Sequence, residues 1–149
     1  MEGIARRGPQ VLIMLVVDAS IALTWCFEDE VTAATEAIGA QVDADGAVVP
    51  TLWRLEVANA LLLAERRGRL DRLGVEQRLQ LLAALPISID VETEARAWND
   101  TMLLARAGRL TLYDAAYLEL AIRINGTLAT LDRALARAAR HLGVAVVAS

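Results

Sequence analysis

Short, continuously apolar runs that alternate with longer helical stretches restrict the fold of this chain more than any other feature. The runs predicted as strands cover residues 12–17, 47–49, 87–89, 128–129 and 144–147. Apolar residues at helical spacing predict helices over residues 21–27, 30–42, 51–67, 71–85, 91–107, 111–124 and 132–142. Strands that alternate with helices form a parallel sheet covered on both faces. The 149 residues therefore predict one α/β domain, a three-layer α/β/α sandwich with a mostly parallel central sheet.

All 15 basic residues are arginine, and this excludes several α/β enzyme classes. A P-loop needs a lysine on the nucleotide phosphates, and Schiff-base chemistry needs an amine. Receiver domains and haloacid-dehalogenase-type phosphatases also use a lysine beside their aspartate. The net charge is −4, so any contact with RNA must come from a local arginine cluster or through a bound cation. The hydrophobic fraction of 56% suggests a buried partner surface or dimer face.

The N-terminus and the single cysteine bear on localisation. Arg6 and Arg7 precede an apolar run that resembles a signal peptide, but the run is short, ends at Asp18 and has no cleavage pattern. We therefore expect no export, no membrane span and a cytoplasmic protein. Cys26 is predicted to be buried, which is consistent with a reducing compartment. Met14 is a second candidate start, which would make residues 1–13 an N-terminal extension and 14–149 the domain.

Four acidic residues stand apart from the solvated ones on polar helix faces. Asp18 and Asp132 each follow a predicted strand, and Glu56 lies on the most apolar helix with no cation near it along that helix. Asp114 occupies the third position after Thr111 at a helix start. Each has a structural alternative. The three aspartates fit helix caps or a capping box, and Glu56 fits an ion pair with a distant arginine.

Considered together, the four acids predict a cation site. The carboxyl ends of parallel strands meet at one edge of a sheet, so the topology can gather these side chains there. Two unit charges ~4 Å apart repel by about 4 kcal/mol at an effective dielectric of ~20. Four carboxylates therefore require a cation or shifted pKa values. An all-oxygen cluster favours Mg²⁺ or Mn²⁺ over Zn²⁺.

Four sequence motifs in the same order resemble those of a PIN domain, in its VapC-type branch. The first two are Val16-Val17-Asp18-Ala19-Ser20 and Pro50-x-x-Trp53-x-x-Glu56-x-x-Asn59-x-Leu61. The last two are Leu110-Thr111-x-Tyr113-Asp114-Ala115-x-Tyr117-x-x-Leu120-Ala121 and Leu128-Ala129-Thr130-x-Asp132-x-x-Leu135-x-x-Ala138. The resemblance spans residues 14–147 and implies a PIN-like sandwich.

The resemblance also implies roles for individual residues. The acidic catalytic and metal-binding residues would be Asp18, Glu56, Asp114 and Asp132. The polar residues that support them would be Ser20, Asn59 and Thr130. The implied activity is hydrolysis of RNA phosphodiesters by a water that one or two Mg²⁺ or Mn²⁺ ions activate, with Asp114 placed to orient or deprotonate that water.

The resemblance further implies the toxin of a type II toxin–antitoxin pair. Its partners would be an RNA substrate, a VapB-type antitoxin whose C-terminal segment covers the acidic cleft, and a second copy of the chain. The apolar helices before residue 86, notably 51–67, are candidates for the antitoxin groove. Two alternatives stay open. One is a PIN nuclease of RNA maturation outside a toxin pair, and the other is a non-catalytic PIN-like binding module whose acids are caps and ion pairs.

Arginine, histidine and aromatic residues outside the motifs complete the predictions. Arg66, Arg67, Arg69 and Arg72 are interpreted as a helix end that favours cations, with an RNA-steering patch as the alternative. We assign His141 no catalytic role. The tyrosines and tryptophans are predicted to lie in the core rather than to stack on bases.

Overall fold

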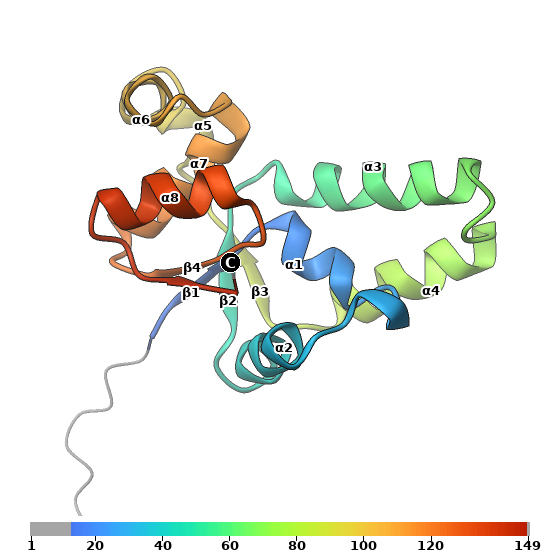
Figure 1. The fold of residues 1–149 in the computed structure, drawn as a ribbon. Helices are drawn as coiled ribbons and strands as arrows, with labels where there is room; N and C mark the ends of the chain where they lie inside the picture. The colour runs from blue at the N-terminus through green and yellow to red at the C-terminus, as the bar shows by residue number, and fades with distance from the viewer. Residues whose placement is uncertain (1–12, 149) are drawn as a thin grey trace, which may run out of the picture.

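A computed structural model describes residues 13–148 and contains one five-stranded parallel sheet (Figure 1). The strands are β1 (Leu15–Val17), β2 (Ala47–Val49), β3 (Ile87–Ile89), β4 (Thr127–Ala129) and β5 (Val146–Val147), in the order β3-β2-β1-β4-β5. Every pairing is parallel, with Val16 opposite Val48 and Leu128. The predicted fold class is confirmed. The expected extension at residues 1–13 falls almost wholly outside the described residues.

Helices connect the strands. They are α1 (Ala19–Thr24), the 3-10 turn η1 (Glu28–Glu30), α2 (Ala33–Asp45), α3 (Trp53–Arg66), α4 (Arg72–Ala83), α5 (Thr93–Arg96), α6 (Asp100–Gly108), α7 (Leu112–Arg123) and α8 (Arg133–His141). Helices α3 and α4 form a hairpin that extends away from the sheet (Figure 1). Of the helices in residues 13–148, none is both long and apolar enough to span a membrane.

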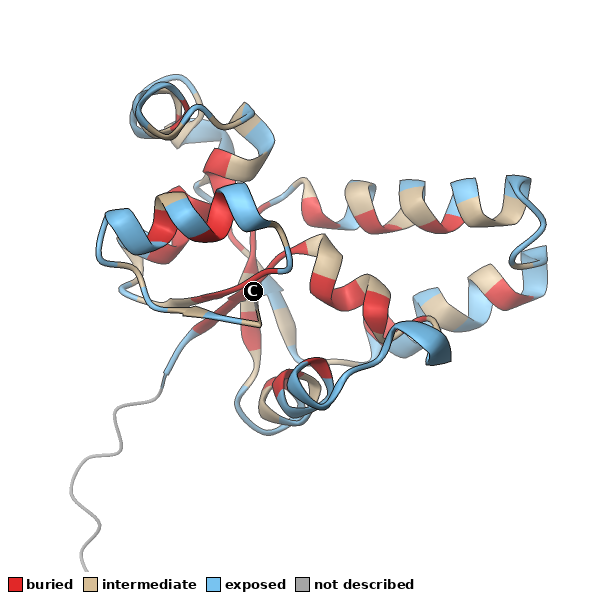
Figure 2. Cartoon of the chain, viewed as in Figure 1, coloured by how far each residue is buried: buried red, intermediate tan, exposed pale blue. Residues whose placement is uncertain are grey.

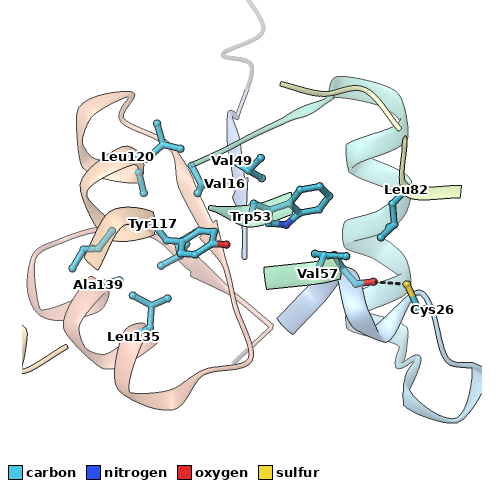
Figure 3. Close-up of a cluster of buried hydrophobic side chains, with 14 of the residues drawn as sticks. Val16, Cys26, Val49, Trp53, Val57, Leu82, Tyr117, Leu120, Leu135 and Ala139 are labelled. Atoms are coloured by element: carbon cyan, nitrogen blue, oxygen red, sulfur yellow. Dashed lines mark hydrogen bonds between the residues drawn. The ribbon is translucent and has the colours of Figure 1, made fainter. Parts of the chain in front are cut away.

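Alternating residues of the central strand β1 join two separate apolar clusters. Leu15 and Val17 pack in a cluster with Ile38 of α2. Val16 belongs to the larger cluster, which includes Tyr117 of α7 (Figure 3). All three β1 residues are buried, so the strand that leads to Asp18 is a fixed support (Figure 2). Cys26 lies in the larger cluster and is 4% exposed, as predicted.

Three predicted boundaries are wrong for local reasons. The helix expected over 91–107 is interrupted between α5 and α6, where Asn99 has φ −113° and ψ −100°. The helix expected over 30–42 continues as α2 to Asp45, and Gly46 with φ 80° follows its last residue. The helix expected over 30–42 begins at residue 33, because the Thr32 hydroxyl caps it by accepting from the Thr35 amide.

Candidate functional site

Asp18 is the most buried of the four acids. It follows β1 and caps α1, where its Oδ1 accepts from the Ile21 amide (3.3 Å) and from Ser20 Oγ (2.5 Å). Thr130 Oγ1 donates to Oδ2. Burial raises the pKa of this carboxyl, and the hydroxyl and amide donors offset part of the rise. Asp18 is therefore a helix cap and also a fixed carboxylate at the end of a buried strand.

The two hydroxyls connect Asp18 to Asp132, at the end of β4. Thr130 Oγ1 accepts from the Asp132 amide (2.9 Å), and Ser20 Oγ accepts from the Leu131 amide (3.0 Å). Asp132 Oδ1 accepts from the Leu135 amide (2.9 Å) and caps α8. Adjacent strand ends thus hold these two acids at the carboxyl edge of the sheet, where the sequence placed them.

Glu56 lies in the first turn of α3 and is half-buried. The Tyr117 hydroxyl donates to its Oε1 (2.5 Å). Burial raises the pKa of Glu56, the Tyr117 hydrogen bond opposes this, and the negative charges of Asp114 and Asp18 raise it further. Among residues 13–148, Glu56 forms no ion pair, so the alternative of a distant arginine partner is not observed.

Asp114 lies in the first turn of α7, where its amide donates to the Thr111 hydroxyl (3.1 Å). Burial raises the pKa of its carboxyl, and the charge of Asp132 adds to the rise. The charges of Asp18 and Asp114 thus raise the pKa of Glu56, and the charge of Asp132 raises the pKa of Asp114. The fold therefore brings Glu56 near Asp18 and Asp114, and Asp114 near Asp132.

The carboxylates are not already arranged around an ion. In the described part of the chain, no three acidic, histidine or cysteine side chains form a ready metal-binding group. Three of the four carboxylates are oriented by other partners: Asp18 by hydroxyls, Glu56 by Tyr117 and Asp132 by the start of α8. The donor set nevertheless fits a hard divalent cation, because all its ligand atoms are oxygens whose charges repel one another.

Tyr117 is a component of the site that the sequence interpretation missed. Its ring lies in the core at 1% exposure, as predicted (Figure 3). Its hydroxyl donates to Glu56. Burial and the bond to Glu56 raise its pKa, so it remains a neutral donor. Its position three residues after Asp114 was the available signal, since i and i+3 share a helix face.

The other predicted residues have mixed outcomes. Tyr113 is 66% exposed and Trp98 87% exposed, so placing them in the core was wrong. Tyr113 lies on the exposed face of α7, and Trp98 lies in the turn between α5 and α6. Trp53 is buried as predicted. Asn59 is exposed on α3, and within residues 13–148 its side chain forms no hydrogen bond to the four acids.

Two of the four arginines in the predicted run form ion pairs. Arg69 donates to Asp29 (2.6 Å) and Glu30 (3.0 Å) and lies over the ring of Phe27 at 3.9 Å. Arg72 pairs with Glu76 at 3.3 Å. These partners favour the structural interpretation of the run over RNA steering.

A buried ion cluster behind the site was not foreseen. Arg123 donates to Asp90 Oδ2 (2.7 Å) and Oδ1 (3.1 Å), and to Glu119 Oε1 (2.8 Å). Asp90 and Glu119 are both buried. The hydrogen bond from Arg123 lowers the pKa of Asp90 despite its burial. The cluster ties the end of β3 to α7, the helix that carries Asp114 and Tyr117.

An apolar groove lies between α3, α4 and β3, where the sequence suggested a partner site. It encloses about 340 Å³, and its lining includes Trp53, Val57, Leu82, Leu85 and Ile89. The Trp53 indole N–H is buried, and among the described residues it has no hydrogen-bond partner.

Comparisons with known proteins give a consistent result. Residues 15–141 match the PIN domain. Ribonuclease VapC3 of Pyrobaculum aerophilum is 37% identical over 123 residues, which cover 82% of this chain and 92% of that protein. Among solved structures, PAE2754 of Pyrobaculum aerophilum has a TM-score of 0.66 at 22% identity, over 91% of this chain and 90% of that one.

Two further solved structures share the fold at low identity. FitAcB of Neisseria gonorrhoeae has a TM-score of 0.63 at 15% identity, covering 89% of this chain and 96% of that one. VapBC2 of Rickettsia felis, solved bound to a DNA fragment from their promoter, also has a TM-score of 0.63, at 10% identity over 90% and 97%.

Proposed function

Because the chain belongs to the PIN domain family, we propose that it is a VapC-type endoribonuclease, dependent on Mg²⁺ or Mn²⁺, that acts in the cytoplasm as the toxin of a toxin–antitoxin pair. The observation that carries the proposal is the placement of the acids: Asp18 and Asp132 stand at adjacent strand ends joined through Ser20 and Thr130, and Glu56 and Asp114 lie in the first turns of α3 and α7. The charges of Asp18 and Asp114 raise the pKa of Glu56, and that of Asp132 raises the pKa of Asp114. A divalent cation is favourable among such carboxylates, because it removes their repulsion.

The four acids would hold the cation, which when bound supplies positive charge to the scissile phosphate and acidity to water. Asp18 is suited to holding the cation in a fixed position, because Ser20 and Thr130 orient both of its carboxylate oxygens. Tyr117 fixes Glu56 in the same way.

Asp114 is suited to the proton-accepting role. The Thr111 hydroxyl lowers the pKa of the Asp114 carboxyl, but burial and the charge of Asp132 outweigh this effect. Its raised pKa brings it closer to neutrality, where a general base is most effective. We infer that a carboxylate oxygen of Asp114 accepts the proton from the water that attacks the phosphodiester.

The partner surfaces follow from the same proposal. The groove between α3 and α4 fits an apolar segment of a VapB-type antitoxin, and a polar atom of that segment would satisfy the Trp53 N–H. A homodimer is expected to bury apolar side chains near α5 and α6, where Trp98, Leu103 and Ile122 are exposed.

Cleavage of RNA by the purified protein tests the proposed activity. We expect hydrolysis with Mn²⁺ and none with EDTA. Asp114→Asn should lower the rate by about 10²–10⁴, the range that a general base contributes. Asp43→Asn is the matched control, because it removes the same charge from an exposed position on α2. Cleavage that persists in EDTA, or equal rates for the two variants, would exclude the proposed mechanism.

The alternatives make different predictions. Asp18 and Asp132 do cap helices, as a non-catalytic module requires, but Glu56 and Asp114 cap none through their carboxylates. A binding module would neither cleave RNA nor respond to Mn²⁺. A nuclease of RNA maturation would cleave but would have no antitoxin encoded beside it.

A further inference from the structure

A row of exposed arginines on α8 begins beside the candidate site. Arg133, Arg137 and Arg140 are spaced at i, i+4 and i+7, which places them on one face of the helix. All three are exposed, and none forms an ion pair with another residue in the range 13–148. Arg133 directly follows Asp132, so the row starts at the acidic edge and leads away from it.

The end of α6 widens this positive surface. Gly108, the last residue of α6, lies close to Ala138 of α8: a Cβ added to this glycine would be 3.2 Å from the Ala138 Cβ. Arg106 and Arg109 flank Gly108 and are exposed. Within the described chain, neither is paired with an acid. The five residues of this α8 arginine surface are Arg106, Arg109, Arg133, Arg137 and Arg140.

The surface differs from the rest of the molecule in charge. Elsewhere, Arg69, Arg72, Arg96 and Arg123 are engaged by acids, and the whole chain carries a net charge of −4. The other arginines without an acid partner in the described chain lie on or at the end of α3 and on α4: Arg54, Arg66, Arg67 and Arg78. A polyanion brought to four carboxylates needs positive charge close by, and α8 carries three unpaired arginines in a row that starts beside Asp132. Guanidinium groups suit this task, since their planar donors match phosphate oxygens.

We propose that the α8 arginine surface binds the backbone phosphates of the RNA strand that occupies the candidate site. The inference rests on the proposed nuclease function and names the part of the chain that holds the substrate beyond the scissile phosphate. An acidic protein segment would also be attracted to arginines. RNA is favoured because the row is continuous with Asp132, a member of the group proposed to act on a phosphodiester.

Binding of RNA by a double variant tests this surface. Arg137→Ala/Arg140→Ala removes two arginines from an exposed helix face that tolerates alanine. Arg66→Ala/Arg67→Ala is the matched control, since it removes the same charge from the far end of α3 (Figure 1). The affinity for a fluorescein-labelled single-stranded RNA of mixed sequence is measured by anisotropy, in EDTA and over a series of salt concentrations.

The expected result is a weaker affinity and a shallower salt dependence for the α8 variant alone. Each lost phosphate contact lowers the slope of log K against log salt by about 0.7, so the pair should lower it by about 1.4. At about 0.1 M salt this corresponds to a roughly 25-fold loss of affinity. Arg137→Lys/Arg140→Lys should retain the slope. With Mn²⁺, the Ala pair should raise KM for cleavage and leave kcat unchanged.

Several outcomes would overturn the inference. One is an α8 variant with the wild-type slope and affinity, and another is an equal loss in the α3 control. A third is an α8 variant that binds RNA normally but loses affinity for poly-L-glutamate, because the surface would then serve an acidic protein. If wild-type protein cleaves RNA in any of these cases, the α8 surface is rejected and the proposed function stands. If it does not cleave, the proposed function itself has failed.

Discussion

Tyr117→Phe is the sharpest structural test of how the candidate site is held. The substitution removes one oxygen and keeps the ring, so the buried apolar contacts of residue 117 are retained. Only the 2.5 Å hydrogen bond to Glu56 Oε1 is lost. The variant therefore isolates the contribution of this bond to the fold and to the orientation of Glu56.

The size of the effect follows from the charge of Glu56. Hydrogen bonds to charged groups contribute about 1.5–3 kcal/mol. Glu56 is only half-buried, so water replaces part of the lost interaction, and we expect a loss of about 1–2 kcal/mol at pH 7. For a domain of this size, each kcal/mol lowers Tm by roughly 2–4 °C.

The destabilisation caused by Tyr117→Phe should depend on pH. The Tyr117 hydrogen bond lowers the pKa of Glu56, so it stabilises the ionised carboxylate. Removing the bond should therefore lower the free energy of unfolding above the pKa of Glu56 in the folded wild type. This destabilisation should decrease as the pH falls and the carboxyl becomes protonated. Groups that both proteins share, such as Asp18 and Asp114, cancel in the comparison.

Urea unfolding of wild type and Tyr117→Phe at pH 7 and at pH 4 measures the difference directly. The expected destabilisation is present at pH 7 and smaller at pH 4. A variant as stable as wild type at pH 7, or one destabilised equally at both pH values, would refute the role assigned to this bond.

Three further predictions concern the same region. Asp18→Asn keeps an acceptor for the Ile21 amide, so the variant should fold. The stabilisation by Mn²⁺ at about 100 times the wild-type Kd, worth ~2.7 kcal/mol in wild type, should fall to about 1.4 kcal/mol or less; an unfolded variant would show that capping is the main role of Asp18. Arg123→Ala leaves Asp90 and Glu119 buried without their cation and should cost about 3–5 kcal/mol in urea unfolding; a loss below about 1 kcal/mol would show that the cluster contributes little. The pKa values of Asp18, Glu56 and Asp114 are raised, so without metal their ionised forms destabilise the fold above those pKa values and do so less as the pH falls. The Tm increase from Mn²⁺ should therefore be larger at pH 7.5 than at pH 5, and a response independent of pH would contradict this.

Local sequence signals predicted the elements and their caps well. Strands β2 and β3 have the predicted bounds, because Gly46 precedes one and Pro86 the other. Asp71, Thr111 and Asp132 cap helices where capping chemistry placed them. The interrupted helix at residues 91–107 was missed because its apolar spacing gives no sign of the backbone break at Asn99.

Contacts between distant residues could not be foreseen. Tyr117 and Glu56 are 61 positions apart, and Arg123 and Asp90 are 33 apart. Arg69 pairs with Asp29 across 40 positions, a partner that the interpretation of this run as a helix end did not include. Each depends on how two helices or a helix and a strand pack, and one sequence alone carries no signal for that.

Calorimetric titration of Mn²⁺ into the wild-type protein and into Asp18→Asn, Glu56→Gln, Asp114→Asn and Asp132→Asn tests most directly whether the four carboxylates form one site. Replacing a residue that only hydrogen-bonds to a metal ligand typically costs about 10–100-fold in metal affinity. Each of these four substitutions of a proposed ligand should therefore weaken Mn²⁺ binding by at least about 10-fold, with the fold intact by circular dichroism. A folded Glu56→Gln or Asp114→Asn protein that binds Mn²⁺ as tightly as wild type would contradict the account.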